Sequence, residues 1–260
     1  MLPVLFEVFG VPINSYGLSK ALAALSAAYL LGREFRRRRG WDPDHAWTMV
    51  MVATVLGFIG AKIYYLLENI QNLSPHLFGS SGFTWYGGLV GGVLSIVVMA
   101  RRYRVPLGEF AGMAAAPLSL AYGIGRIGCF LSGDGTYGKP SDVPWAMAFP
   151  NGTMPTLERV HPTALYEAII AFILAGVLWA LRARLVPVAL FGLYAVASGL
   201  ARFLVEELRI NDEVLLGLTQ PQLWSLLLAA IGAALLVRTS HRQEAGKDAV
   251  RQAPSTLETG

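Results

Sequence analysis

Long apolar stretches separated by short polar segments run along most of the 260-residue chain. Many of these stretches approach the roughly 20 residues that an α-helix needs to cross a lipid bilayer. They predict membrane-spanning helices at about residues 16–32, 46–67, 85–100, 107–131, 162–181, 187–206 and 221–237. The pattern therefore predicts an all-α, polytopic membrane protein with about seven transmembrane helices, which form a single domain over residues 1–238.

Basic residues gather in short runs that follow the first, third, fifth and seventh predicted spans. The runs are arginines 33 and 36–39, then 101, 102 and 104, then 182 and 184, then 238 and 242. Basic residues in short loops generally stay in the cytoplasm. This arrangement predicts an N-terminus outside and a cytoplasmic C-terminus, with periplasmic loops at about 68–84, 132–160 and 207–220. The polar segment 239–260 is expected to be a disordered cytoplasmic tail.

The composition favours a membrane protein over a soluble one, because 54% of the residues are hydrophobic and only 15% are charged. The net charge of +4 lies largely in the loop runs, so it does not indicate a nucleic acid partner. The single cysteine, Cys129, excludes an internal disulfide. The chain has no HExxH motif and no paired Cys/His spacing, so a metal is not expected.

Two arginines lie within predicted spans, Arg126 in the fourth and Arg202 in the sixth. A guanidinium keeps its charge, and at a helix centre it costs roughly 2.5–3.5 kcal/mol on insertion scales. Because the commonest anion in a bilayer is a lipid phosphate, the two arginines predict a phospholipid headgroup site near the outer membrane edge. Two alternatives are that Arg126 extends to the interface and that Arg202 only pairs with Glu206, four residues on.

Three glycines around Arg126, at positions 123, 125 and 128, match the G-x-G-x-x-G pattern of dinucleotide-binding proteins. That fingerprint needs a preceding strand, whereas this one lies in a hydrophobic span, so a nucleotide is not expected. The glycines instead predict a thin helix that a lipid headgroup can approach. Glu167, in the fifth span, suits a structural ion pair as well as a catalytic role.

An ordered set of short motifs extends from about residue 10 to residue 237. The set comprises Tyr16-Gly17-Leu18, Gly60-Ala61-Lys62, Gly125-Arg126-Ile127-Gly128, Tyr137-Gly138, Pro144-Trp145, His161-Pro162, Leu165-Tyr166-Glu167 and Arg202-Phe203-Leu204-Val205-Glu206. Each motif alone is weak, but in this order the set resembles the prolipoprotein diacylglyceryl transferase family. The resemblance implies a bacterial inner-membrane enzyme that moves the diacylglyceryl group of phosphatidylglycerol to a prolipoprotein lipobox cysteine and releases glycerol phosphate. It implies phosphatidylglycerol, a prolipoprotein signal peptide and membrane lipids as partners, and no cofactor.

The resemblance also implies individual site residues. Arg126 and Arg202 match the two essential arginines of the family, and Tyr16 matches its tyrosine in the first span. Tyr86 stands where the family often has a histidine that is a proposed base, and Asp134 lies near the family's glutamate, so both are candidate catalytic residues. Further candidates for substrate binding are Gly128, Cys129, Gly138, His161 and Glu206.

Departures from the family pattern leave the general base and the acceptor open. Tyr86 replaces a histidine, Cys129 an asparagine and Lys62 an arginine, and the loop at Asp134 is one residue longer. A tyrosine with a pKa of about 10 is a poor base at neutral pH, so the thiol proton passes to Asp134, Glu206 or bulk water. The alternatives are a paralogue with another acceptor, a lipid carried covalently on Cys129, and a non-catalytic lipid-binding membrane protein.

Overall fold

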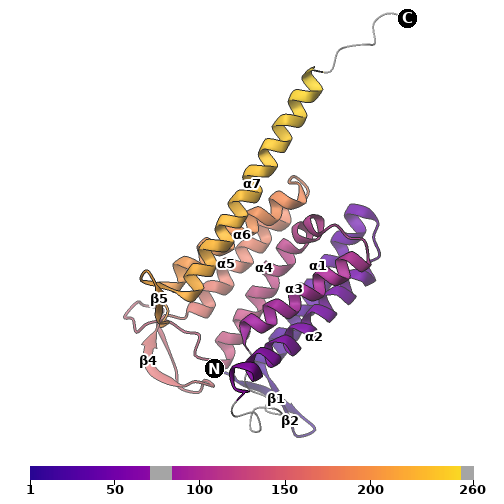
Figure 1. Ribbon diagram of the computed structural model, residues 1–260. Coiled ribbons are helices and arrows are strands. Elements are labelled where there is room, and N and C mark those ends of the chain that lie inside the picture. Colours follow the sequence, from indigo (N-terminus) through magenta and orange to yellow (C-terminus); the bar gives the residue numbers. More distant parts are fainter. Residues whose placement is uncertain (71–83, 253–260) are drawn as a thin grey trace, which may run out of the picture.

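Helices make up most of the computed structural model, which describes residues 1–70 and 84–252 (Figure 1). The helices are α1 (Ser15–Arg39), α2 (Pro43–Glu68), α3 (Trp85–Arg102), α4 (Leu107–Ser132), α5 (Thr163–Leu181), α6 (Pro187–Glu206) and α7 (Gln220–Gln252). Each predicted span overlaps one of these helices. Only α1 and α7 extend far beyond the predicted limits, because polar residues that continue a helix carry no hydropathy signal.

Five helices of the described residues are long and apolar enough to cross a membrane. They are α2, α4, α5, α6 and the Gln220–Arg242 part of α7. The other two are less apolar, because serines, glycines and Lys20 dilute α1 while two arginines end the 18-residue α3. The prediction of a mostly helical chain with several helices suited to a membrane is confirmed. The count of seven spans and their orientation remain predictions.

Three short two-stranded antiparallel hairpins accompany the helices in the described residues, which the sequence analysis did not predict. They are β1 (Val4–Val8) with β2 (Val11–Asn14), β3 (Met147–Phe149) with β4 (Thr156–Val160), and β5 (Glu213–Leu215) with β6 (Leu218–Thr219). The first and third turn through residue pairs with positive φ, Phe9-Gly10 and Leu216-Gly217, as tight hairpin turns require. Strands this short carry too little alternation to stand out from the sequence.

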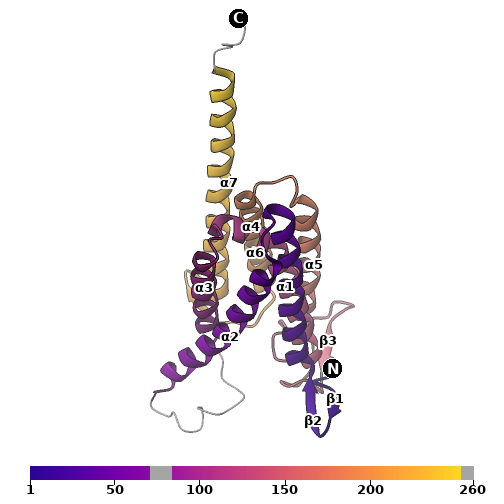
Figure 2. The same ribbon diagram turned by 90° about the vertical axis from the view of Figure 1, so that its right-hand side faces the viewer.

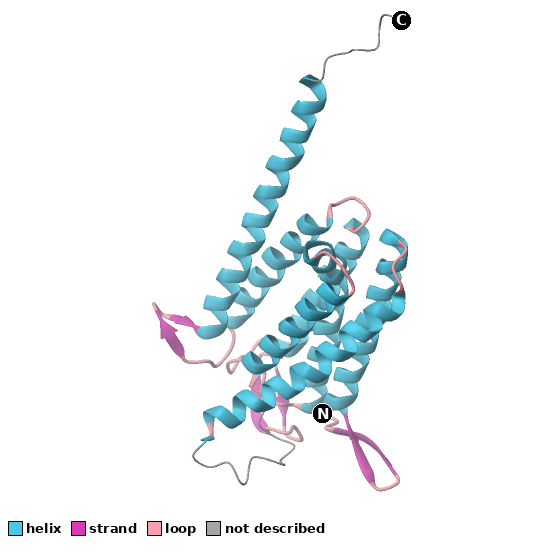
Figure 3. Cartoon of the chain, turned by 45° about the vertical axis from the view of Figure 1, so that its right-hand side comes forward, coloured by secondary structure: helices cyan, strands magenta, loops and turns pink. Residues whose placement is uncertain are grey.

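The hairpins gather at one end of the helices (Figure 3). The N-terminus lies at that end, and α7 projects well beyond the other helices at the opposite end (Figure 2). Helix α7 ends at Gln252, so it includes the first part of the segment 239–260 that was expected to be a disordered tail. Residues 253–260, and the part of the predicted outer loop at 71–83, lie outside the described residues.

Helix α4 is the centre of the bundle, because it packs against α1, α5 and α6. Helices α2 and α3 form a second close pair, in which a Cβ on Gly87 would lie 2.2 Å from the carbonyl oxygen of Gly60. Backbone contact of this kind is how small residues join membrane helices. The pairing directs α3 toward α2 and leaves it little contact with α4.

Candidate functional site

The position of Arg126 is set by the tight packing of its helix. A Cβ on Gly128 would lie 2.6 Å from the Cβ of Ser19 in α1, and one on Gly123 would lie 2.7 Å from the ring of Phe172 in α5. These glycines let α4 pack tightly between α1 and α5. Their role in admitting a lipid headgroup remains a prediction.

Arg126 and Arg202 meet at one carboxylate, that of Glu167 in α5. Nε of Arg126 lies 2.8 Å from Oε2 of Glu167, and Nη1 of Arg202 lies 3.2 Å from Oε1. Glu167 is only 4% exposed. Helices α4, α5 and α6 thus bring together the two arginines that the sequence predicts to bind a lipid phosphate, and they place a carboxylate between them.

A second carboxylate, that of Glu206, lies beside the first. Its Oε2 is 2.6 Å from Nη2 of Arg202, which forms the pair expected from their spacing, and 3.4 Å from Nε of Arg209. Its Oε1 accepts hydrogen bonds from Asn211 at 2.5 Å and from Thr219 at 3.0 Å. Glu206 is buried and surrounded by hydrogen-bond donors, so it holds Arg202 and Arg209 in place.

We call Arg126, Arg202, Arg209, Glu167 and Glu206 the arginine cluster. Three positive charges against two negative ones leave one net positive charge. Burial lowers the pKa of Arg209, just beyond α6, but a guanidinium stays charged near neutral pH. The side chains of Arg126 and Arg202 are 17% and 22% exposed, so an anion can reach them from one side. An unbalanced positive charge in a poorly hydrated site favours such an anion.

Tyr122, one turn before Arg126 on α4, is a part of the site that sequence reasoning missed. Its hydroxyl donates to Oε1 of Glu167 and accepts from Nε and Nη2 of Arg126, each at 3.0 Å. The spacing of four residues, which puts both on one helix face, was the available signal. Tyr122 fixes one side of the Arg126 guanidinium and leaves Nη1 facing Sγ of Cys129, 4.0 Å away.

Cys129 and Asp134 line a small cavity at the end of α4. Oδ1 of Asp134 accepts from the backbone N–H of Thr136 at 3.1 Å and from its hydroxyl at 2.7 Å. The carbonyl of Thr136 in turn accepts from Nη1 of Arg209 at 2.6 Å. The loop that carries Asp134 is therefore bonded directly to the arginine cluster.

Tyr16 lies in the first turn of α1, beside the turn of α4 that carries Gly128. A Cβ on Gly128 would lie 3.6 Å from the Cα of Tyr16, and the ammonium of Lys20 lies 5.0 Å from the centre of the Tyr16 ring. Tyr16 is 41% exposed. The structure thus places Tyr16, Lys20 and Gly128 beside the turn that carries Arg126.

Gly138 and His161 connect two loops through their backbones and form no ion pair within the arginine cluster. The backbone N–H of Gly138 donates to the carbonyl of His161 at 2.8 Å, and a Cβ on Gly138 would lie 2.3 Å from the carbonyl oxygen of Leu208. Nδ1 of His161 lies 3.1 Å from the hydroxyl of Tyr166. These contacts hold the loop after α4 against the segment after α6, which favours a structural role for both residues.

Tyr86 packs among aromatic side chains of α2, α3 and α7. Its ring contacts in the described part of the chain are with Tyr64, Trp85 and Trp224, and it shares no hydrogen bond with the cluster there. The cause is the close packing of α3 on α2. The residues described here also hold no group of three or more His, Cys, Asp or Glu side chains that could bind a metal ion.

Comparison with known proteins identifies similar chains. The family model for prolipoprotein diacylglyceryl transferase matches residues 3–238. Three relatives named phosphatidylglycerol–prolipoprotein diacylglyceryl transferase illustrate the similarity. The protein of Clostridium tetani is 35% identical over 80% of this chain and 86% of its own length. Those of Idiomarina loihiensis and Pasteurella multocida are each 31% identical, over 94% of this chain and 95% and 94% of their own lengths.

Proposed function

Because the chain belongs to the prolipoprotein diacylglyceryl transferase family, we propose that it transfers the diacylglyceryl group of phosphatidylglycerol to the lipobox cysteine of a prolipoprotein. Glycerol phosphate is the second product. The observation that carries this proposal is the convergence of Arg126 and Arg202 on Glu167. Two guanidiniums that share one carboxylate are close enough together to bind a single phosphate group.

The reaction exchanges one bond for another at a glycerol carbon. The sulfur of the acceptor forms a C–S bond, the C–O bond to the phosphate breaks, and the electron pair leaves with glycerol phosphate. The phosphate gains negative charge as this bond breaks. A preformed site with net positive charge binds the departing group more tightly than the starting phosphodiester, which lowers the barrier.

The donors for the phosphate come from Arg126 and Arg202. Nη1 of Arg126 has the Cys129 sulfur as a distant partner, at 4.0 Å. Nη1 of Arg202 lies 3.2 Å from Glu167 without an aligned hydrogen bond. Nη1 of Arg126 binds one phosphate oxygen, and Nη1 of Arg202 gives up its unaligned contact with Glu167 to bind another. Tyr122 keeps its hydrogen bonds to the Nε and Nη2 side of Arg126, and Glu206 keeps Nη2 of Arg202. Guanidinium pairs of this kind suit phosphate because each offers two parallel N–H groups.

Asp134 is the best placed acceptor for the thiol proton. Glu206 is buried and bonded to two arginines, and Tyr86 lies against Trp224. Asp134 is partly exposed and lines the small cavity beside Cys129. A thiol with an ordinary pKa of about 8.5 needs such a base, or nearby positive charge, to attack as thiolate.

The proposal includes seven spans in the bacterial inner membrane, with the hairpins and the arginine cluster at the periplasmic end. The basic runs at the other end of the bundle support this orientation. Phosphatidylglycerol enters from the surrounding lipids, and the prolipoprotein signal peptide enters from within the membrane. The proposal needs no metal, nucleotide or nucleic acid.

A transfer assay with the purified full-length protein tests this function. In vesicles of phosphatidylglycerol, a synthetic lipobox peptide should gain one diacylglyceryl group and release an equal amount of glycerol phosphate, measured by mass spectrometry. A peptide with serine in place of the acceptor cysteine is the control and should stay unmodified. Release of glycerol phosphate without modified peptide, or no release at all, would contradict the proposal.

A further inference from the structure

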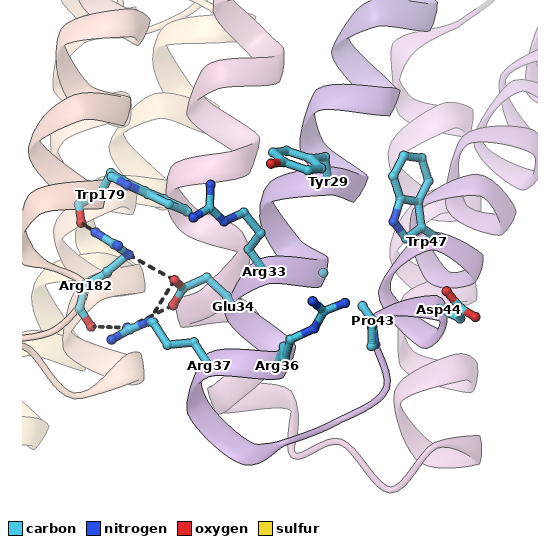
Figure 4. A pocket seen from close by; sticks show the side chains of 11 residues that line it. Tyr29, Arg33, Glu34, Arg36, Arg37, Pro43, Asp44, Trp47, Trp179 and Arg182 are labelled. Atoms are coloured by element: carbon cyan, nitrogen blue, oxygen red, sulfur yellow. Dashed lines mark hydrogen bonds and ion pairs between the residues drawn. The ribbon is translucent and has the colours of Figure 1, made fainter.

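A second cavity lies at the opposite end of the bundle, between the last turns of α1 and α5 and the first turn of α2 (Figure 4). Its volume is about 550 Å³, which is within the range of roughly 300–1,000 Å³ that ligand sites usually have. Four arginines and two acidic residues line it. We call this cavity the basic pocket.

One buried carboxylate balances part of its charge. Glu34 is 2% exposed and lies 3.1 Å from Nε of Arg37, 3.4 Å from Nε of Arg38 and 2.9 Å from Nε of Arg182. Three guanidiniums thus share a single carboxylate across α1 and α5. This group closes one side of the pocket and retains an excess of positive charge.

Arg33 and Arg36 supply the remaining charge. Neither forms an ion pair with a carboxylate in the described part of the chain, and Arg33 lies over the ring of Tyr29 at 5.8 Å. Figure 4 shows Arg33 on the α5 side of the pocket and Arg36 on the α2 side. Both are exposed, so their N–H groups are free to bind an anion.

An apolar stripe leads along α1 to these two arginines. Leu22, Leu25 and Tyr29 are 48%, 46% and 54% exposed, and their spacing puts them on one helix face. Trp47 and Trp179 line opposite sides of the pocket, and tryptophan is enriched at membrane interfaces. A free phosphate would use only the arginines, whereas a phospholipid would cover the stripe as well.

We propose that the basic pocket binds the headgroup of an anionic phospholipid of the cytoplasmic leaflet. Arg33 and Arg36 bind the phosphate, and an acyl chain lies along Leu22, Leu25 and Tyr29. Basic pockets between membrane helices on the cytoplasmic side suit such lipids. The site is separate from the arginine cluster, and its assignment to a leaflet rests on the proposed orientation.

Lipid binding to the full-length protein tests this site. Phosphatidylserine is the probe, because it is anionic and is not the donor of the proposed reaction. Native mass spectrometry should show the wild-type protein binding phosphatidylserine at least tenfold more tightly than phosphatidylcholine. The R33Q/R36Q variant should lose about tenfold in affinity for phosphatidylserine. The matched control R101Q/R102Q removes the same charge from the end of α3, outside the pocket, and should keep the wild-type affinity.

Three results would overturn the proposal. One is equal affinity for phosphatidylserine and phosphatidylcholine, and another is an equal loss in both double variants, which would indicate unspecific attraction. The third is displacement of phosphatidylserine by millimolar inorganic phosphate, which would indicate a site for a free anion. An Arg126→Ala variant should still bind phosphatidylserine, so failure of this site and failure of the transferase proposal are distinguishable.

Discussion

Replacing Arg202 with alanine should lower diacylglyceryl transfer by roughly 10²–10³-fold, and Arg126→Ala should do the same. Each change removes one of the two cations that stabilise the departing phosphate. Lysine at either position should restore only part of the rate, because an ammonium keeps the charge but lacks the paired N–H groups. The measurement is glycerol phosphate release per folded protein molecule from phosphatidylglycerol vesicles.

Folding has to be checked in the same variants, because each leaves a buried carboxylate with fewer partners. The melting temperature in detergent serves this purpose, and Lys variants that melt normally separate rate from stability. Arg184→Ala is the matched control, since Arg184 is an exposed arginine just after α5, and it should keep full activity. Wild-type transfer by a folded Arg126→Ala or Arg202→Ala protein would exclude the proposed role of that residue.

A Glu167→Gln variant should lower kcat by roughly 10–100-fold without raising KM for phosphatidylglycerol. Glu167 positions both guanidiniums, and their misplacement by a fraction of an ångström weakens contacts made in the transition state. Loss of its charge also raises the net charge of the cluster by one, which favours binding of the anionic donor. Steady-state kinetics over a range of phosphatidylglycerol concentrations separates the two parameters.

A purely structural role for Glu167 predicts a different outcome. The folded fraction would fall, while kcat per folded molecule and KM would stay at wild-type values. Glu109→Gln is the matched control, because Glu109 is in the first turn of α4, at the other end of the helix that carries Arg126. It should leave kcat and KM unchanged.

The helices and the two arginines were predictable because both depend on local features. Apolar stretches of about 20 residues identify helices, and a charged residue within one is costly enough to indicate function. That Arg126 and Arg202 share one phospholipid site was expected from their charge within two apolar spans, and the family resemblance implied the same. The bridging role of Glu167 depends on how α4, α5 and α6 pack, and a single sequence does not specify that packing.

Other features of the site could not be recognised, or could not be decided, from the sequence for equally specific reasons. Tyr122 is an ordinary aromatic residue in an apolar helix, and only its spacing from Arg126 connects it to the site. Tyr86 was named because of a family resemblance, and its ring lies near those of Tyr64 and Trp224. Its catalytic role stays a prediction. The arginines of the basic pocket served in the sequence only to predict which loops are cytoplasmic. The pocket itself could not be predicted, because Glu34 and Arg182 meet only in the folded chain.

The most direct test of the central claim is an experimental structure of the full-length protein with a phosphonate analogue of phosphatidylglycerol that cannot release its headgroup. One phosphonate group should lie within hydrogen-bond distance of the guanidiniums of both Arg126 and Arg202, with Glu167 behind them. A phosphonate bound by only one of these arginines, or bound elsewhere while both keep all their contacts to Glu167 and Glu206, would contradict it.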